Sequence, residues 1–233
     1  MRRGRPTSTG SVEKALAKQP WSILVPALTG AGVSPDQAIE RLRQYCKGLV
    51  EWNRTTSNIM SSNDEHRIVE RHLLESLAPA AWLIESGCRD WVDFGSGAGF
   101  PAIPLVMAGV AGRWTLVESR RTKTLFLRKT IQNMQLQCFE VVHDRLENLT
   151  SDPERAGTFD GFTSRATLRL GPTLELAAPI VRPGGSAFLW KGSGRDQEIE
   201  DNLAWRGAWD LAGVLAVGSG VNAVARFTRN NNI

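Results

Sequence analysis

Residues 90–101 decide the fold, and they read Asp90-Trp91-Val92-Asp93-Phe94-Gly95-Ser96-Gly97-Ala98-Gly99-Phe100-Pro101. A short apolar run ends in an acid and passes into a Gly-x-Gly-x-Gly turn. This pattern is typical of a buried parallel strand followed by a helix whose first backbone N–H groups face a ligand. Glycine adopts turn conformations that are closed to other residues and lets a ligand approach the backbone closely. The segment therefore predicts a ligand-binding turn between a strand and a helix.

Short apolar strands alternate with helices on the C-terminal side of this turn. The expected strands span residues 90–94, 113–118, 138–142, 159–163, 185–190, 211–217 and 222–228, and the expected helices span 101–110, 120–135, 145–149, 171–181 and 195–204. This alternation is typical of an α/β protein with right-handed crossovers and a mostly parallel sheet covered on both faces. Only Gly218-Ser219-Gly220 separates the last two strands, so we expect an antiparallel hairpin at one edge.

The segment before the turn has helical periodicity instead. We expect one helix from Ser34 to about Asn53, with Ser34 as its N-cap and Gln37 completing a capping box. A second helix is expected over 65–86, bent or split at Pro79. Residues 1–20 are basic and poorly patterned, which indicates a mobile tail. The predicted organisation is thus a tail (1–20), a small helical cap (21–86) and an α/β domain (87–233).

The composition narrows the class of protein. No run of 18 apolar residues occurs in the 233, so no transmembrane helix is expected. The basic N-terminus lacks the apolar core of a signal peptide, which favours a cytoplasmic protein. The three cysteines fit neither metal-binding nor disulfide spacing, so no metal site is expected. A net charge of +4 permits a polyanionic partner without requiring one.

Four predicted strand ends indicate one ligand crevice, and the turn could serve a dinucleotide or an adenosyl cofactor. A dinucleotide fold prefers Gly-x-Gly-x-x-Gly, and Phe100 at the third glycine position counts against an NAD-dependent oxidoreductase. Glu118 ends the next strand, where a carboxylate can accept both ribose hydroxyls or can cap the following helix. The third strand end carries 143–147, which would flank an adenine, and the fourth presents Ser164 and Arg165. Because ligands bind beyond the carboxyl ends of open parallel sheets, these ends converge.

Several segments between about Leu49 and Lys191 occur in a family-specific order. They are Leu49-Val50-Glu51-Trp52-Asn53, Glu70-Arg71-His72-Leu73-Leu74-Glu75-Ser76-Leu77, Asp93 to Pro101, Val117-Glu118-Ser119, Lys123, Phe126-Leu127, Thr163-Ser164-Arg165-Ala166 and Leu189-Trp190-Lys191-Gly192. On these residues the chain resembles the bacterial 16S rRNA guanine-N7 methyltransferases of the RsmG (GidB) family. It departs from the usual pattern at Ala102 (usually Gly), at Glu75 and Glu118 (usually Asp), and at Asn58-Ile59-Met60.

The resemblance implies a Rossmann-like S-adenosylmethionine-dependent methyltransferase fold with a helical cap. It implies S-adenosylmethionine as the cofactor, and 16S rRNA or the 30S subunit as the partner of a monomeric enzyme. The candidate cofactor-binding residues are Asp93, Gly95, Gly97, Gly99, Phe100, Glu118, Leu146, Glu147 and Arg165. Among these, Glu118 would bind the ribose, and Leu146 with Glu147 would lie beside the adenine.

Arg165 is the candidate catalytic residue, acting by positioning. Guanine N7 has a lone pair and no proton, so no general base is expected, and the planar fork of an arginine suits a phosphate or guanine O6. The candidate RNA-binding residues are Arg120, Arg121, Lys123 and Lys191, with a solvated helix face and a turn-capping lysine as the alternatives. The alternative functions are a methyltransferase of another substrate and a non-catalytic RNA-binding module of ribosome assembly.

Overall fold

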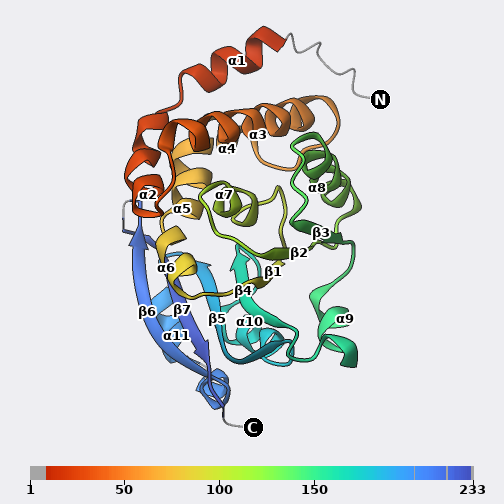
Figure 1. Cartoon of the computed structure of the whole chain (residues 1–233), viewed down its shortest axis with the longest axis vertical. Coiled ribbons are helices and arrows are strands. Elements are labelled where there is room, and N and C mark those ends of the chain that lie inside the picture. Colours follow the sequence, from red (N-terminus) through yellow and green to blue (C-terminus); the bar gives the residue numbers. More distant parts are fainter. Residues whose placement is uncertain (1–8, 202, 219, 232–233) are drawn as a thin grey trace.

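A seven-stranded sheet in the order β3-β2-β1-β4-β5-β7-β6 organises the molecule. The computed structural model describes residues 9–201, 203–218 and 220–231 (Figure 1). The strands are β1 (Asp90–Phe94), β2 (Arg113–Val117), β3 (Phe139–Val142), β4 (Phe159–Arg165), β5 (Val181–Lys191), β6 (Trp209–Val217) and β7 (Asn222–Arg229). Strands β1 to β5 pair in parallel, whereas β7 pairs antiparallel with both β5 and β6. The predicted parallel sheet with an antiparallel edge hairpin is confirmed.

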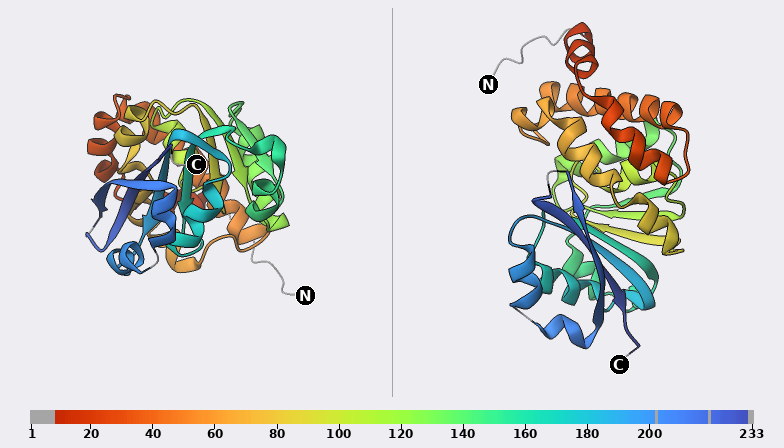
Figure 2. Two further views of the ribbon diagram at one scale, coloured as in Figure 1. Left: turned by 90° about the horizontal axis from the view of Figure 1, so that it is seen from below. Right: turned by 90° about the vertical axis from the view of Figure 1, so that its left-hand side faces the viewer.

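Helices cover both faces of this sheet, as the alternating pattern predicts (Figure 2). They are α7 (Ala102–Met107), α8 (Arg121–Asn133), α9 (Leu146–Thr150), α10 (Leu170–Ala177) and α11 (Arg195–Glu200), with 3-10 turns at Pro153–Arg155 and Leu203–Gly207. Neighbouring residues of a strand point to opposite faces. Trp91 of β1 therefore lies in the core shared with α7, α8 and the N-terminal helices, while Val92 lies in the core beneath α9 and α10.

The N-terminal helices form a cap at one end of the molecule (Figure 1). They are α1 (Thr9–Ala17), the 3-10 turn η1 (Trp21–Leu24), α2 (Val25–Gly30), α3 (Pro35–Thr55), α4 (Ser62–His66), the π-helix η2 (Ile68–Leu73), α5 (Leu74–Leu77) and α6 (Ala80–Glu85). Helix α3 begins after Ser34 as predicted, but the Ser34 hydroxyl makes no cap hydrogen bond, so the predicted capping box is wrong. The helix predicted over 65–86 is broken at the π-helix as well as at Pro79.

The predicted mobile tail of residues 1–20 is wrong for residues 9–20. Helix α1 packs along α3, and its Val12 and Leu16 are 1% and 6% exposed. The indole of Trp21 donates a hydrogen bond to the Leu16 carbonyl at 2.8 Å, which fixes the end of α1. Two apolar residues four positions apart make one buried helical face, although the segment is mainly polar. Residues 1–8, with Arg2, Arg3 and Arg5, lie outside the described residues.

Candidate active site

A cavity of about 360 Å³ lies between the carboxyl ends of the central strands and the helical cap. The sheet side contributes the glycine loop 95–98 after β1, Arg165 at the end of β4, and 190–192 at the end of β5. The cap side contributes residues from α4, η2 and α5, among them Asp64 and Glu75. Small-molecule sites typically measure about 300–1,000 Å³. The predicted convergence of strand ends thus produces a cavity of ligand size.

The glycine loop is built from residues with left-handed backbone angles. Gly95, Gly97 and Gly99 have φ angles of +69°, +59° and +96°. A Cβ added to Gly95 would lie 2.5 Å from the Thr167 side chain, and one added to Gly99 would lie 2.5 Å from that of Ile103. At either position the side chain in contact would have to shift to make room for a Cβ. The left-handed backbone angles favour glycine here, and the close packing adds to that preference.

The backbone N–H groups of this loop are largely used within the protein. Those of Gly95 and Ser96 donate to the Val117 carbonyl at 2.9 and 3.2 Å. The Gly97 N–H donates to the Glu118 carboxylate at 2.9 Å, and the Gly99 N–H donates to the Ser96 carbonyl at 2.7 Å. Two of these bonds hold the loop on β2, the third joins it to Glu118 just after β2, and the fourth lies within the loop.

Glu118 fixes the loop to the start of α8. Its carboxylate is buried and accepts hydrogen bonds from the N–H groups of Gly97 at 2.9 Å and of Arg120 at 2.7 Å. Arg120 is the N-cap residue of α8, and no side chain caps the N–H groups of the first turn, so Glu118 does not cap the helix. Each carboxylate oxygen keeps a further lone pair that a ribose hydroxyl could use. Glu118 does not line the cavity itself.

Asp93 lies beneath the glycine loop and is fully buried. One carboxylate oxygen accepts a hydrogen bond from the Thr163 hydroxyl at 2.6 Å, which joins β1 to β4. The other oxygen has no hydrogen-bond partner among the described residues. Burial raises the pKa of Asp93 to about 7, against the opposing effect of the Thr163 bond. The structure therefore places this predicted cofactor residue behind the loop, where it supports the loop from below.

Aromatic contacts attach the loop to the cap. The ring of Phe100 stacks on His72, with 4.9 Å between centroids, and meets Tyr45 edge-on at 5.6 Å. The Tyr45 hydroxyl donates a hydrogen bond to the Ala98 carbonyl at 2.5 Å. Burial lowers the pKa of His72 to about 4, and the positive charge of Arg165 acts in the same direction. His72 is therefore a neutral wall of the cavity at pH 7.

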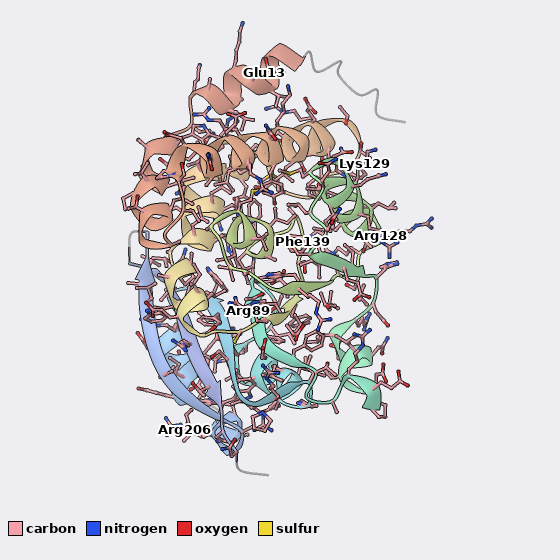
Figure 3. All side chains as sticks on the ribbon, viewed as in Figure 1. Glu13, Arg89, Arg128, Lys129, Phe139 and Arg206 are labelled. Atoms are coloured by element: carbon pink, nitrogen blue, oxygen red, sulfur yellow. The ribbon has the colours of Figure 1, made fainter. Side chains whose placement is uncertain are left out.

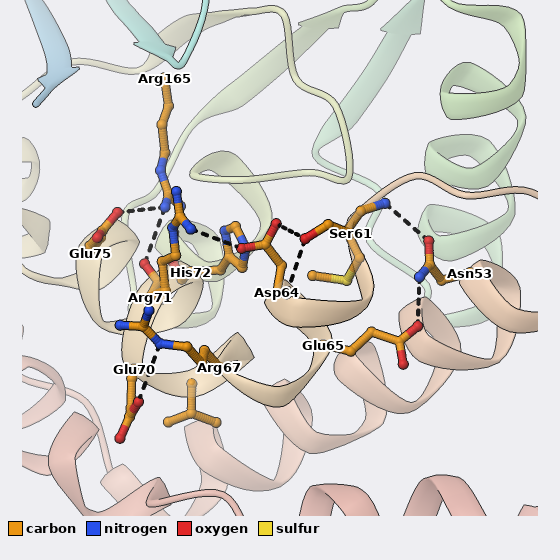
Figure 4. A network of polar contacts seen from close by, with 12 residues as sticks. Asn53, Ser61, Asp64, Glu65, Arg67, Glu70, Arg71, His72, Glu75 and Arg165 are labelled. Atoms are coloured by element: carbon orange, nitrogen blue, oxygen red, sulfur yellow. Dashed lines mark hydrogen bonds and ion pairs between the residues drawn. The ribbon is translucent and has the colours of Figure 1, made fainter.

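Arg165 connects the sheet to the cap (Figure 4). Its guanidinium donates to the Glu75 carboxylate at 2.6 Å, to the carbonyls of Arg71 and His72 at 3.1 and 3.2 Å, and to the Ser76 hydroxyl at 3.3 Å. Burial lowers the pKa of Arg165, and the Glu75 carboxylate opposes that effect. The predicted catalytic arginine thus lines the cavity while being held by four groups of the cap.

Glu75 joins the cap to two further strands. Its second carboxylate oxygen accepts a hydrogen bond from the Asn222 amide at 2.7 Å, at the start of β7. Its backbone carbonyl accepts one from the Trp190 indole at 2.7 Å, at the end of β5. With Arg165 on β4, three strand ends meet at this one residue of α5.

Of three further predicted site residues, two lie outside the cavity and one lines it. Leu146 is buried in the core under the sheet and Glu147 is exposed on α9, so neither lines the cavity. Lys191 lines the cavity, but its ammonium lies 3.0 Å from Glu198 and donates to the Leu168 carbonyl at 2.7 Å. Burial lowers the pKa of Lys191.

The basic side chains at the start of α8 do not all lie on one face of the helix. Arg120 and Arg121 are exposed, whereas Lys123 turns into the cavity. Farther along the helix, Arg128 and Lys129 lie on the outer surface (Figure 3). The sequence assigned Lys123 to RNA contact together with the two arginines, and only the structure separates them.

The sequence analysis did not predict that several residues of the helical cap line the cavity. Glu75 and His72 belong to segment 70–77, one of the segments that carry the family resemblance. Membership of that segment was the sequence signal that could have identified them as site residues. Asp64 accepts from Ser61 and pairs with Arg71 at 3.1 Å, and nothing in its sequence context indicates that position. Asn222 likewise gave no signal, because its partner Glu75 lies 147 positions away.

The described part of the chain holds no group of three or more His, Cys, Asp or Glu side chains arranged to bind a metal ion. None of its helices combines the length and the apolar character that a membrane span requires.

Comparison with known proteins relates this site to one family. Residues 38–206 match the family model described as rRNA small subunit methyltransferase G. The protein of that name from Dictyoglomus thermophilum is 34% identical over 177 residues, which cover 76% of this chain and 70% of the relative. One from Syntrophobacter fumaroxidans, named Ribosomal RNA small subunit methyltransferase G 1, is 36% identical over 177 residues, covering 74% and 77%.

Solved structures share the fold. A magnesium protoporphyrin IX methyltransferase from Synechocystis with bound S-adenosylmethionine has a TM-score of 0.56 at 17% identity, covering 84% of this chain and 97% of that one. A SAM-dependent methyltransferase from Aquifex aeolicus has a TM-score of 0.54 at 18% identity, covering 71% and 95%. At this identity the likeness concerns the fold alone, and it confirms the predicted Rossmann-like methyltransferase architecture.

Proposed function

The chain belongs to the rRNA small subunit methyltransferase G family, and from this premise we propose that it methylates N7 of a guanine in 16S rRNA. The methyl donor is S-adenosylmethionine. The observation that carries the proposal is the cavity between the glycine loop and the cap, with Arg165 in its lining. The family relationship does not favour the alternatives of another methyl acceptor or a non-catalytic assembly module.

The residues of the site fit the cofactor. The glycine loop presents backbone without side chains, and any Cβ at Gly95 would collide with Thr167. Glu118 keeps lone pairs for ribose hydroxyls. Leu146 and Glu147 do not line the cavity, and their place beside the adenine stays a prediction from the family resemblance. When bound, this cofactor supplies a methyl group already activated by a sulfonium. The chain must then orient the acceptor and exclude water.

The side chains of the cavity suit an acceptor that needs no deprotonation. Guanine N7 carries a lone pair and no proton, so a methyl group accepted there from the bound cofactor would displace no proton from the base. The one histidine that lines the cavity, His72, is neutral at pH 7 because burial lowers its pKa to about 4. The charge of Arg165 is balanced by Glu75 at 2.6 Å, so the arginine adds no free cation beside the sulfonium. The cap takes the donors of both its terminal nitrogens, which leaves the Nε–H for the acceptor.

Arg120 and Arg121 supply the proposed RNA surface beside the cavity. Both are exposed at the start of α8, and arginine suits phosphate through its planar set of donors. Lys191 is proposed at the same mouth, although its ammonium already has protein partners. The proposed partner is 16S rRNA, free or in the 30S subunit, and action as a monomer in the cytoplasm stays a prediction.

The test is methyl transfer with purified components. The protein is incubated with methyl-labelled S-adenosylmethionine and either 30S subunits lacking the modification, naked 16S rRNA, or small-molecule acceptors. We expect label in 16S rRNA, recovered as 7-methylguanine after digestion, and none in small acceptors. Label on another atom or only in small acceptors would contradict the proposal. Binding of S-adenosylhomocysteine without turnover on any ribosomal substrate would favour the non-catalytic module.

A further inference from the structure

The cationic side chains that line the cavity differ in their partners. Three of them are paired with carboxylates: Arg71 with Asp64 at 3.1 Å, Arg165 with Glu75 at 2.6 Å, and Lys191 with Glu198 at 3.0 Å. Within the described part of the chain, Lys123 is the lining cation that has no carboxylate partner. An unpaired ammonium in a ligand cavity is a candidate for binding an anionic group of the ligand.

Lys123 faces the glycine loop. Its Nζ lies 3.7 Å from the point that a Cβ on Gly97 would occupy, and that same point lies 3.6 Å from the Gly95 carbonyl oxygen. Because Gly97 has no side chain, the space between the loop backbone and the ammonium is open on the cavity side. The neighbouring Arg120 and Arg121 are exposed and so cannot take this place.

The backbone supplies few free donors at this position. The N–H groups of Gly95, Ser96, Gly97 and Gly99 all donate within the protein, whereas those of Ala98 and Phe100 have no hydrogen bond among the described residues. Helix α7 has only six residues. A charged partner for an anion held against this loop therefore has to be a side chain, and Lys123 is the lining cation without a carboxylate partner.

We propose that Lys123 binds the α-carboxylate of the methionine part of S-adenosylmethionine, an inference that rests on the proposed function. A carboxylate that leaves water for a partly enclosed cavity requires a compensating charge. Lysine provides this as a compact ammonium with three donors on a flexible stem. The carboxylate would occupy the open space in front of Gly97. Lys123 is then a cofactor-binding residue and not an RNA contact.

The experiment compares two ligands that differ only in this carboxylate. Binding of S-adenosylmethionine and of decarboxylated S-adenosylmethionine is measured by calorimetry, without RNA, for the wild type and Lys123→Met. We expect the variant to lose about tenfold to a hundredfold in affinity for the intact cofactor, as for a lost hydrogen bond to a charged group. Affinity for the decarboxylated ligand should stay unchanged. Lys123→Arg, which keeps the charge, should retain a preference for the intact cofactor.

Lys129→Met is the matched control, because it removes the same charge from the exposed surface of the same helix. It should bind both ligands as the wild type does. An equal loss for both ligands in Lys123→Met, or no loss for either, would overturn the inference. Unchanged cofactor binding with weaker binding of 16S rRNA would overturn it in favour of a phosphate contact. A wild type that binds no S-adenosylmethionine would instead overturn the proposed function.

Discussion

The two walls of the cavity are built by different kinds of interaction. The glycine-loop wall (residues 93–100) is held by hydrogen bonds to the end of the neighbouring strand β2 and to Glu118, which follows it, 21 positions after Gly97. The cap wall (residues 64–76) is held to the sheet by charged groups far apart in sequence, such as Glu75 and Arg165 of β4, 90 positions apart. One wall therefore depends on backbone conformation, and the other on a buried ion pair that two separate parts of the chain must bring together.

The largest effect should come from breaking the cap wall at Glu75. Glu75→Ala leaves Arg165 buried without its carboxylate, and an uncompensated buried charge typically costs about 3–5 kcal/mol. We expect a loss of that size in the free energy of unfolding measured with urea, together with loss of methyl transfer. Glu85→Ala, at an exposed position of α6, is the control. A cost of less than about 1 kcal/mol, the range of a surface ion pair, would contradict the role given to this pair.

Arg165→Ala should abolish methyl transfer. The arginine lines the cavity and makes four contacts with the cap, so both positioning and attachment are lost. Initial rates on 30S subunits would be measured at a temperature at which circular dichroism shows the variant to be folded. Activity retained by the folded variant would exclude Arg165 from the reaction.

Adding a single methyl group to the glycine-loop wall should lower both stability and ligand affinity. Gly95→Ala combines a left-handed backbone penalty of about 1–2 kcal/mol with a collision against Thr167, so we expect a total cost of about 2–4 kcal/mol and weaker S-adenosylhomocysteine binding. Gly184→Ala is the matched control, because Gly184 also has a left-handed φ, +80°, but no atom within 4 Å of the added Cβ. It should lose only the backbone term and bind the ligand normally. Equal effects of the two substitutions would mean that packing against Thr167 is unimportant.

The buried Asp93 beneath the loop predicts a pH effect. Burial raises its pKa to about 7, so the folded state holds a proton that the unfolded state releases near pH 4. This contribution to stability is complete below pH 4 and is lost as the pH rises to 7. Between pH 5 and 7 we expect the wild type to lose about 2 kcal/mol relative to Asp93→Asn, which can still accept from Thr163. Parallel pH profiles of the two proteins would contradict the raised pKa.

The smallest effect should come from Arg121→Ala, which lies outside both walls. Removing one exposed phosphate contact should weaken 16S rRNA binding uniformly and lower the salt dependence of log K by about one. Cofactor affinity and stability should not change. Arg89→Ala, just before the amino end of β1 and so at the opposite edge of the sheet, removes the same charge and should leave RNA binding unaltered (Figure 3). Equal losses for both variants would indicate a nonspecific charge effect.

The same contrast explains what could be predicted from the sequence. The strands and the glycine loop follow from local patterns, such as the apolar run before Gly95, because backbone conformation is a local property. The pairing of Glu75 with Arg165 and Asn222 depends on how the cap lies on the sheet, which no local pattern encodes. Helix α1 was missed because its buried face consists of only Val12 and Leu16 in a polar segment.

The central claim is that the two walls form one site for methyl transfer to 16S rRNA. The most direct test maps 7-methylguanine in 16S rRNA from cells with the gene, without it, and with the deletion complemented by the wild type or by Arg165→Ala. We predict one 7-methylguanine that is lost on deletion, returns with the wild type and does not return with the variant. A 16S rRNA whose 7-methylguanine content is the same in all four strains would contradict the claim.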